Sequence, residues 1–397
     1  MKRGDIFDLY RKHVNAGKID VYEGYGLNAI MGRRAGVRFW DAYDDRSWIN
    51  CHCNGGVFNL GHRNPAVLAA VRDSLEDHDI GNHHLPAASR ADLARRLSGS
   101  TGGLLPGVVF GVAGGEAIDL AIKVARAATV RTGIVSASGG FHGHTGLALA
   151  AGDAQYRDPF GPNSPGFIQV PFNDLDAMDA AIDHTAAAVI LEPIPATLGM
   201  PIPDGDYLPA VQQMCRERGA KLILDEVQTG LGRTGRMWAY EHWDLEPDVV
   251  VTGKGLSGGV YPISATLMTR ELHSLFDTEP FIHISTFGGS EPGAAAALAV
   301  LDLVETPGFL DHVTDLEDRF VDGLADMPFR LRHLGLMMAL IFPAPQAGMY
   351  AMKLLFDAGL FTVYANNDTS ALQFLPPLVT TDDEADEIIG IVQSVFG

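Results

Sequence analysis

The sequence predicts an α/β fold: a large three-layer αβα unit with a mostly parallel sheet, joined to a smaller α+β unit. From about residue 105 to residue 253, short β-branched runs alternate with amphipathic helical patterns, which is the rhythm of βαβ units. These runs are apolar without alternation, as expected when helices cover both faces of a sheet. After about residue 300 the pattern changes to helices with short strands.

The predicted elements follow one another in a regular order. The predicted strands are VVFGV (108–112), GIVSAS (133–138), FIQVPF (167–172), AAVILE (187–192), KLILDE (221–226) and DVVVTG (248–253), and the predicted helices span 116–129, 175–184, 207–218 and the Ala-rich stretch 293–304. We expect three parts: residues 1–45, which pack with the small domain, residues 46–300 as the large domain, and residues 301–397 as the small domain.

The charge and the cysteine content restrict the classes of partner. A formal net charge of −20 over 397 residues argues against nucleic acid or an anionic membrane surface, which would repel the chain at long range. No apolar stretch has the length of a membrane span. The first 20 residues lack the apolar core of a secretory signal, and three cysteines form no disulfide framework, so we expect a cytoplasmic protein.

Two cysteine-containing segments do not predict a metal site. Cys51 and Cys53 form a single Cys-x-Cys with no second pair at zinc-site spacing. Cys215 recurs with Leu208 and Val211 at helical spacing, which indicates a core position. We therefore expect no metal.

Residues just past the predicted strand ends are candidate ligand contacts, because parallel sheets bind ligands at the carboxyl ends of their strands. Gly114 and Gly115 open a helix after such a strand, where free N–H groups and the helix dipole can hold an anion such as phosphate. A tight strand-to-helix turn explains the same residues. Phe141 and His142 lie in the glycine-rich SASGGFHGHTG, either against a flat ligand or as a buried aromatic with a hydrogen-bonded histidine.

The next two strand ends carry charged groups. KLILDEVQTGLGRTG ends a strand with Asp225 and Glu226, which alternation places on opposite sides of the strand. Asp225 can keep a ring nitrogen protonated, although a helix-capping role is the alternative. Lys254 follows the next strand among glycines, where a solvated surface cation is the ordinary explanation. Together, the anion site, the aromatic residue, the carboxylate and the lysine meet the needs of pyridoxal phosphate (PLP).

The motifs LILDEVQTGLGRTG, PDVVVTGKGLSGGVYPISA and STFGG resemble the class III aminotransferases, which are fold-type I PLP enzymes. The resemblance extends from FWDAYDDRSWINCHCNGGVFNLGHRNPAV at 39–67 to LQFLPPLVTTDDEADE near the C-terminus. It implies a ping-pong aminotransferase that forms a Schiff base at Lys254 and works as a homodimer with shared active sites. The implied cofactor contacts are Asp225 (ring nitrogen), Gln228 (phenolic oxygen), Phe141 (ring face, beside His142), Gly114 and Gly115 (phosphate), Glu192 (near the cofactor) and Thr286 (phosphate of the neighbouring subunit).

Two departures from the family pattern concern the substrate. EPIPATLG places Thr197 where members acting on ornithine-like substrates have a second glutamate, and ALQFLPPL places Gln373 where many members have an arginine. An amide cannot replace the charge and fork geometry of a guanidinium–carboxylate contact. We therefore expect no such grip on a substrate α-carboxylate. Further residues that border the substrate pocket in relatives, or that simply pack in the fold, are Tyr22, Tyr25, Asn54 and His83.

The motifs allow more than one type of reaction. The same fold supports racemases or epimerases, aminomutases, decarboxylases and cyclases, so these remain alternatives to amino transfer between small amines or amino acids and oxo acids. A non-catalytic binding protein of this fold is a remote alternative, since such a protein would be expected to lose Lys254 or Asp225, and both are present.

Overall fold

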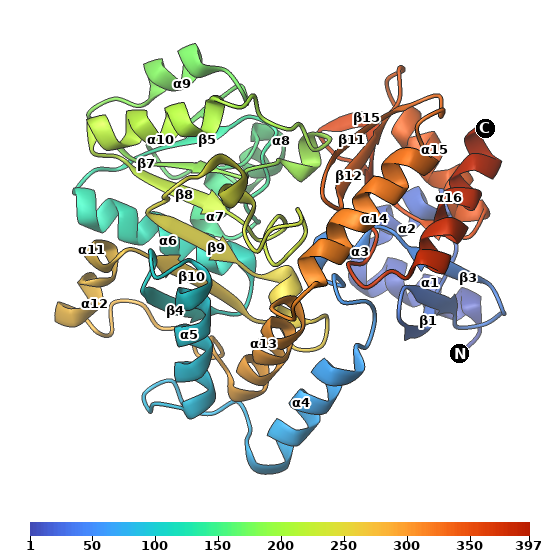
Figure 1. Cartoon of the computed structure of the whole chain (residues 1–397), viewed down its shortest axis with the longest axis horizontal. Coiled ribbons are helices and arrows are strands. Elements are labelled where there is room, and N and C mark those ends of the chain that lie inside the picture. The colour runs from blue at the N-terminus through green and yellow to red at the C-terminus, as the bar shows by residue number, and fades with distance from the viewer.

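The computed structural model describes residues 1–397, and its largest element is a seven-stranded sheet on the left of Figure 1. In sheet order its strands are β4 (Gly107–Gly111), β10 (Ser264–Met268), β9 (Val249–Thr252), β8 (Lys221–Asp225), β7 (Ala186–Leu191), β5 (Gly133–Ala137) and β6 (Phe167–Val170). The five strands from β9 to β6 run parallel, whereas β10 runs antiparallel to both β4 and β9. The predicted mostly parallel sheet is confirmed; β10 is the strand that the sequence did not indicate.

Helices cover both faces of this sheet, and successive residues of one strand show why its strands are apolar throughout. In β8, Leu222 and Leu224 belong to a buried cluster of 30 residues on one face, whereas Ile223 belongs to a cluster of 18 on the other. The first face is covered by α5 (Ala88–Ser100), α9 (Leu175–Ala181), α10 (Tyr207–Arg218) and α13 (Glu291–Val304), and the second by α6 (Gly114–Thr129), α7 (Gly146–Ala150) and α11 (Arg270–His273). The three-layer αβα prediction is confirmed.

A second, smaller sheet lies at the opposite side of the molecule and is built from C-terminal residues (Figure 1). Its antiparallel strands are, in sheet order, β11 (Arg330–Leu334), β12 (Met337–Ile341), β15 (Asp368–Phe374) and β14 (Val363–Ala365). We call it the C-terminal sheet. The accompanying helices are α14 (Phe309–Gly323), α15 (Ala347–Asp357) and α16 (Asp382–Phe396). Thr381 and Glu384 form a capping box that fixes the start of α16.

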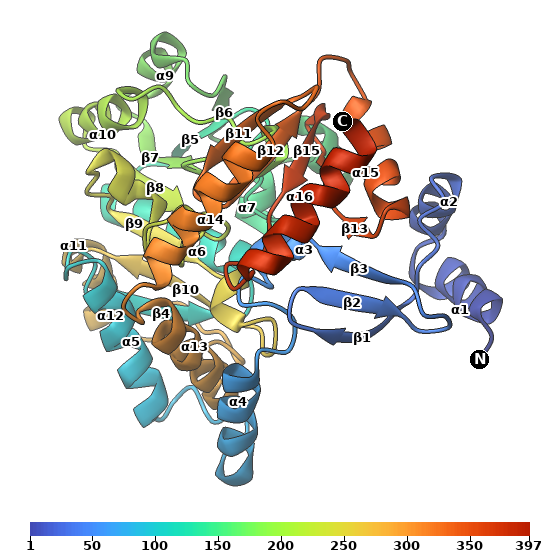
Figure 2. The same cartoon turned by 45° about the vertical axis from the view of Figure 1, so that its right-hand side comes forward.

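The N-terminal strands share a core with these C-terminal elements (Figure 2). The strands β1 (Met31–Ala35), β2 (Arg38–Asp41) and β3 (Ser47–Asn50) form a sheet with β13 (Leu360–Phe361), which runs parallel to β3. Phe39 and Trp48 stack with their ring centroids 5.3 Å apart, and the cluster of 26 buried residues that contains them also contains Leu360 and Phe374. The two ends of the chain therefore stabilise one another.

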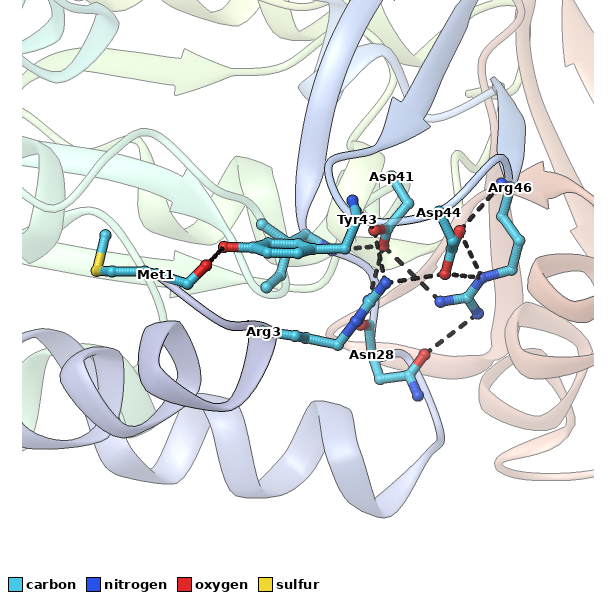
Figure 3. A network of polar contacts seen from close by, with 8 residues as sticks. Met1, Arg3, Asn28, Asp41, Tyr43, Asp44 and Arg46 are labelled. Atoms are coloured by element: carbon cyan, nitrogen blue, oxygen red, sulfur yellow. Dashed lines mark hydrogen bonds and ion pairs between the residues drawn. The ribbon is translucent and has the colours of Figure 1, made fainter.

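A buried carboxylate anchors the first residues of the chain (Figure 3). Asp41 accepts two hydrogen bonds from the Arg3 guanidinium, at 2.7 and 2.9 Å, and others from the N–H groups of Ile30 and Tyr43. Burial opposes ionisation, but these hydrogen bonds and the Arg3 charge outweigh it and hold the pKa of Asp41 below its ordinary value. The segment that this contact fixes contains α1 (Arg3–Tyr10), the π-helix η1 (Arg11–Asn15) and α2 (Ala16–Gly24).

The remaining short elements connect these layers. They are α3 (Cys53–Gly56), α4 (Pro65–Asp77), α8 (Ala154–Arg157), η2 (Asp158–Phe160), η3 (Ala196–Leu198), η4 (Ala239–Trp243), η5 (Lys254–Ser257) and α12 (Leu275–Thr278). No single helix is long and apolar enough to cross a membrane; α13 and α14 pass such a test only as a pair, by length and composition, across a bend of 68°. Cys215 is buried in the core, as predicted.

Candidate active site

Lys254 lies two residues past the end of β9, after Gly253, and adopts a conformation that is uncommon for a residue with a side chain, with φ at 40°. Its Nζ donates a hydrogen bond of 2.7 Å to Oε1 of Gln228. Burial lowers the pKa of Lys254, and the nearby carboxylates of Asp225 and Glu192 only partly oppose this effect. The structure therefore offers an amine that gives up its proton more readily than a surface lysine does.

Asp225 ends β8 and is paired with His142. Oδ2 of Asp225 lies 2.9 Å from Nδ1 of His142, and Oδ1 accepts the N–H of Val227 at 3.1 Å. The two paired side chains are only 5% and 1% exposed. Burial alone would lower the pKa of His142, but the hydrogen bond and charge of Asp225 raise it. Nε2 of His142 is buried and has no protein partner, so this atom is able to form a hydrogen bond with a ligand.

Glu226, the next residue, lies on the other side of the strand. Its carboxyl group accepts hydrogen bonds from the N–H of Tyr240, at 2.8 Å, and from the hydroxyl of Thr229. Burial raises the pKa of Glu226 to about 7. Period-2 alternation thus sends one of two adjacent carboxyl groups to the cavity and the other into the protein interior.

Glu192, at the end of β7, fixes the loop that carries Phe141. Its Oε1 accepts the N–H of Phe141 at 2.8 Å. Burial, together with the charge of Asp225, raises the pKa of Glu192 to about 7, although His142 opposes this. Phe141 is 37% exposed as a residue, and its ring lies 5.1 Å from the ring of His144, centroid to centroid. The hydrogen bond between the Phe141 backbone and Glu192 therefore keeps the apolar ring at the cavity.

Gly114 and Gly115 begin α6 at a point where side chains would not fit. A Cβ on Gly115 would lie 2.9 Å from Oγ1 of Thr145, and one on Gly114 would lie 3.1 Å from Cγ1 of Val227. The residue before them, Ala113, offers no side-chain cap, so the first N–H groups of this 16-residue helix have no protein acceptor within it. Free N–H groups at the positive end of a helix suit a phosphate.

These groups surround one cavity of about 130 Å³. Its lining consists of Gly114, Gly115, Phe141, His142, Gly143, Glu192, Asp225, Val227, Gln228 and Lys254. Eight of these ten residues are ones that the sequence singled out for PLP. A second cavity of about 330 Å³ shares Gly114 and Lys254 with it.

The donor set fits PLP. Lys254 supplies a primary amine, Asp225 a carboxylate, and the start of α6 a set of phosphate donors. Nε2 of Gln228 is buried without a protein partner, as is Nε2 of His142, so both amide and imidazole have hydrogen-bonding capacity left for a ligand. Phe141 and Val227 are the two apolar side chains in the lining, which suits the faces of a flat ring.

The other predicted residues lie outside this cavity. Thr286 is exposed, in a segment whose phenylalanine and isoleucine side chains are also exposed. Thr197 donates its hydroxyl to the carbonyl of Gly139 at 2.8 Å, and Gln373 is buried on β15 opposite Ala339. Asn54 is exposed with φ at 50°, and His83 lines a separate cavity beside Phe281.

Tyr22 and Tyr25 approach the C-terminal part of the chain. Burial raises the pKa of Tyr364, and the two N-terminal tyrosines add to this effect. The hydroxyl of Tyr25 lies 4.0 Å from Sδ of Met349. These tyrosines therefore belong to the region between the N-terminal helices and the C-terminal sheet.

Four residues near Lys254 were missed by sequence reasoning. Val227 and Gly143 line the cavity, and a Cβ on Gly55 would lie 3.4 Å from Nζ of Lys254. Burial, with the charge of Lys254 as a second cause, lowers the pKa of His52 to about 4. Val227 could have been found between Asp225 and Gln228 in the quoted motif. His52 and Gly55 flank Asn54, which the resemblance placed at the border of the substrate pocket, but nothing in their own sequence indicates a position beside Lys254.

The CHC segment lies beside the site without forming a metal centre. Burial raises the pKa of the Cys53 thiol to about 12, although the Arg233 guanidinium opposes the shift. No group of three or more His, Cys, Asp and Glu side chains is arranged to hold a metal ion.

Comparison with known proteins gives a consistent result. Residues 23–396 match the family model described as aminotransferase class-III. A relative from Archaeoglobus fulgidus, described as an uncharacterized aminotransferase, is 47% identical over 392 residues, which cover 97% of this chain and 92% of the relative. The ornithine aminotransferase of Toxoplasma gondii has a TM-score of 0.89 at 26% identity, with 100% of this chain and 95% of that chain covered.

An amine transaminase from an uncultivated Pseudomonas species, solved in its PLP-bound form, has a TM-score of 0.84 at 25% identity and covers 93% of this chain and 94% of its own. The family that the motifs indicated is thus confirmed over nearly the whole length. Class III aminotransferases depend on PLP, and the lining of the cavity fits that cofactor. The chain belongs to the class III aminotransferase family.

Proposed function

We propose that this PLP-dependent aminotransferase performs its reaction in the cavity of about 130 Å³ around Lys254. The observation that carries the proposal is the convergence of eight separately predicted residues on that cavity. Its substrates are small amino and oxo compounds, as the family implies. The relatives do not favour a racemase, aminomutase, decarboxylase or cyclase.

Each lining residue has a role in this proposal. Lys254 would hold PLP covalently, Asp225 would contact the ring nitrogen, and Gln228 the phenolic oxygen. The N–H groups of Gly114 and Gly115 would bind the phosphate. Phe141, beside His142, would lie against the ring, and Glu192 would hold the Phe141 loop through the hydrogen bond of 2.8 Å.

The chain supplies proton transfer and charge stabilisation. When bound, PLP supplies an electron-accepting ring to the amino group that is transferred. Lys254, once released by the incoming amine, would take a proton from Cα of the substrate and deliver it to the cofactor, not back to Cα, a role that suits an amine with a lowered pKa. Asp225 would stabilise a positive charge on the ring nitrogen of the bound cofactor. His142 and the N–H of Val227 hold its two oxygens in place, at 2.9 and 3.1 Å.

The test of this assignment follows the absorbance of bound PLP when an amine is added to the enzyme. We expect conversion to the pyridoxamine form with release of a carbonyl compound, and recovery when a 2-oxo acid is added. Lys254→Ala should abolish covalent attachment and turnover, whereas Lys12→Ala, at an exposed lysine, should leave both unchanged. Full turnover by Lys254→Ala, or loss of substrate chirality with no spectral conversion, would contradict the proposal.

We also propose that the enzyme does not grip a substrate α-carboxylate through a guanidinium–glutamate pair. Thr197 and Gln373 are neutral, and the Thr197 hydroxyl is already engaged with Gly139. A fair test compares an amine with the amino acid that differs from it only by the α-carboxylate. We expect their kcat/KM values to lie within about tenfold, which is ~1.4 kcal/mol. A preference for the amino acid above a hundredfold would overturn this part.

A homodimer would complete the site. Phe281 and Phe287 are 68% and 57% exposed, and Ile282 and Ile284 are exposed between them, which is typical of an interaction surface. Thr286 lies in the same segment, so this surface would bring it to the phosphate of the neighbouring subunit. Phe287→Asp should produce monomers and weaken PLP binding in parallel. A strictly monomeric, fully active wild-type enzyme would exclude the shared site.

Two further parts of the proposal concern organisation and location. We propose a division into residues 1–45, 46–300 and 301–397, supported by Leu27, Val37 and Phe39 in the core cluster of the C-terminal elements. The same cluster contains Trp48, Ile49 and Cys51, so the N-terminal part extends a few residues past 45. A cytoplasmic location is supported by Cys51, Cys53 and Cys215, all of which are free.

A further inference from the structure

Asn367, in the turn between β14 and β15, makes hydrogen bonds to four residues in the segments that connect strands of the seven-stranded sheet: Gly139, Gln155, Tyr156 and Thr197. Its N–H donates to the carbonyl of Thr197 at 2.9 Å, and its Nδ2 donates to the carbonyl of Gly139 at 3.0 Å. Its Oδ1 accepts Nε2 of Gln155 at 2.8 Å and the hydroxyl of Tyr156 at 3.2 Å. An asparagine with both ends of its amide engaged is fixed in orientation.

Gly139, whose carbonyl accepts the hydrogen bond from Asn367, lies at the start of the loop that carries Phe141. Thr197 donates to the same carbonyl, at 2.8 Å. The N–H of Gly139 donates to Asp153 at 2.8 Å, so both backbone groups of this glycine are engaged. Gly139 has φ at +80°, and a Cβ there would lie 2.7 Å from Cδ1 of Leu198. The loop is therefore pressed against η3 and cannot carry a side chain at this point.

The same loop is held at its other end by Glu192, which accepts the N–H of Phe141. One anchor thus belongs to the seven-stranded sheet and the other, Asn367, belongs to the C-terminal sheet. The Asn367 side chain therefore links the C-terminal sheet to the Gly139 carbonyl, at the start of the loop that carries Phe141.

We propose that Asn367 is a positioning residue of the aminotransferase. Through its hydrogen bonds to Gly139 and Thr197, it holds the Phe141 loop against the C-terminal sheet. The inference rests on the proposed function, because it needs Phe141 to lie against PLP. Asn367 acts through Gly139 and has no contact with the reacting atoms. Its loss should therefore loosen the binding of PLP and of the amino substrate more than it slows the chemical step.

The experiment uses the full-length holoenzyme and three variants. Asn367→Ala removes every side-chain bond, and Asn367→Asp keeps an acceptor for Gln155 and Tyr156 but removes the donor to Gly139. Asn366→Ala is the matched control, since Asn366 is exposed in the same turn. For both Asn367 variants we expect the Kd of PLP and the KM of an amine substrate to rise about tenfold, while kcat stays within about twofold. The visible circular dichroism of bound PLP should weaken, and Asn366→Ala should match the wild type.

Thr197→Val provides a second route to the same question without altering Asn367. It removes the other donor to the Gly139 carbonyl, so it should raise the Kd of PLP in the same direction, and the effects of Thr197→Val and Asn367→Ala should not add. The inference is overturned if the Asn367 variants keep the Kd, KM and dichroism of the Asn366→Ala control. It is also overturned if kcat falls as far as KM rises. A wild-type enzyme without PLP absorbance would instead contradict the proposed function.

Discussion

Replacing Glu226 by glutamine should flatten the pH dependence of stability. The carboxyl group is buried at the end of β8, where the N–H of Tyr240 and the hydroxyl of Thr229 donate to it. Glutamine has nearly the same shape and keeps an oxygen for Tyr240, but it does not ionise. The variant therefore removes the titration of one group while it leaves the packing in place.

The expected magnitude follows from the pKa of this group. Burial raises the pKa of Glu226 from 4.5 to about 7, so the folded protein holds this proton more tightly than the unfolded chain does. The stability that this group contributes is fully present below pH 4.5 and is lost as the pH rises through 7. Since one pKa unit corresponds to ~1.4 kcal/mol, ionisation costs the folded state about 3 kcal/mol, of which about 2.5 kcal/mol falls between pH 5 and pH 8.

The assay is urea unfolding of the PLP-free protein at several pH values, followed by tryptophan fluorescence. Relative to the wild type, Glu226→Gln should gain about 2.5 kcal/mol between pH 5 and pH 8. Glu192, whose pKa is also raised to about 7 by burial, is present in both proteins and cancels in the difference. Glu76→Gln, at an exposed carboxylate, is the control and should parallel the wild type. Parallel curves for Glu226→Gln would refute the reasoning.

Three further predictions concern other parts of the molecule. Gly55→Ala should slow Schiff-base formation, seen in the absorbance of added PLP, because the new Cβ would lie 3.4 Å from Nζ of Lys254 at a φ of +65°. Arg233→Met should lower the free energy of unfolding by roughly 3 kcal/mol in urea titrations, because it strands the buried carbonyl groups of Leu336 and Pro376. The pKa of Asp41 is lowered, so the contact with Arg3 should be lost as the pH falls below 3.8, the ordinary pKa of the group, and the N-terminal helices should be released. Proteolysis of residues 1–24 should report this release, and Asp41→Asn should show it already at neutral pH.

The sequence carried most of the information about the seven-stranded sheet. Unbroken apolar strands such as 187–192 can be stable only between two layers, and the helix predicted at 207–218 has those bounds in the structure. The strand β10 was missed because its sequence, SATLM, contains a single β-branched residue and no unbroken apolar run. Its antiparallel pairing with β4 also joins residues more than 100 positions apart. Local periodicity contains no record of such a pairing.

The candidate site was predictable where its residues follow strand ends, because those ends meet at one edge of the sheet. Asp225 and Lys254 were placed in this way, whereas Gln228 was assigned through the family resemblance. His142 was expected near the ligand, but its pairing with Asp225 joins residues 83 positions apart and could not be read from local sequence. Asn367 comes from a turn with no motif of its own, and only the folded chain brings its amide to Gly139.

The parallel pairing of β3 with β13 joins a strand that is synthesised early to one that is synthesised near the end of the chain. Residue 49 is made early, but its partner at residue 360 emerges from the ribosome more than 300 residues later. At about 5–20 residues per second, the N-terminal hairpin waits roughly 15–60 s with an unpaired edge and an apolar face. The sheet around Lys254 is complete before that wait ends. A transcript truncated before residue 360 should therefore yield a chain in which the edge of β3 is unpaired and open to aggregation.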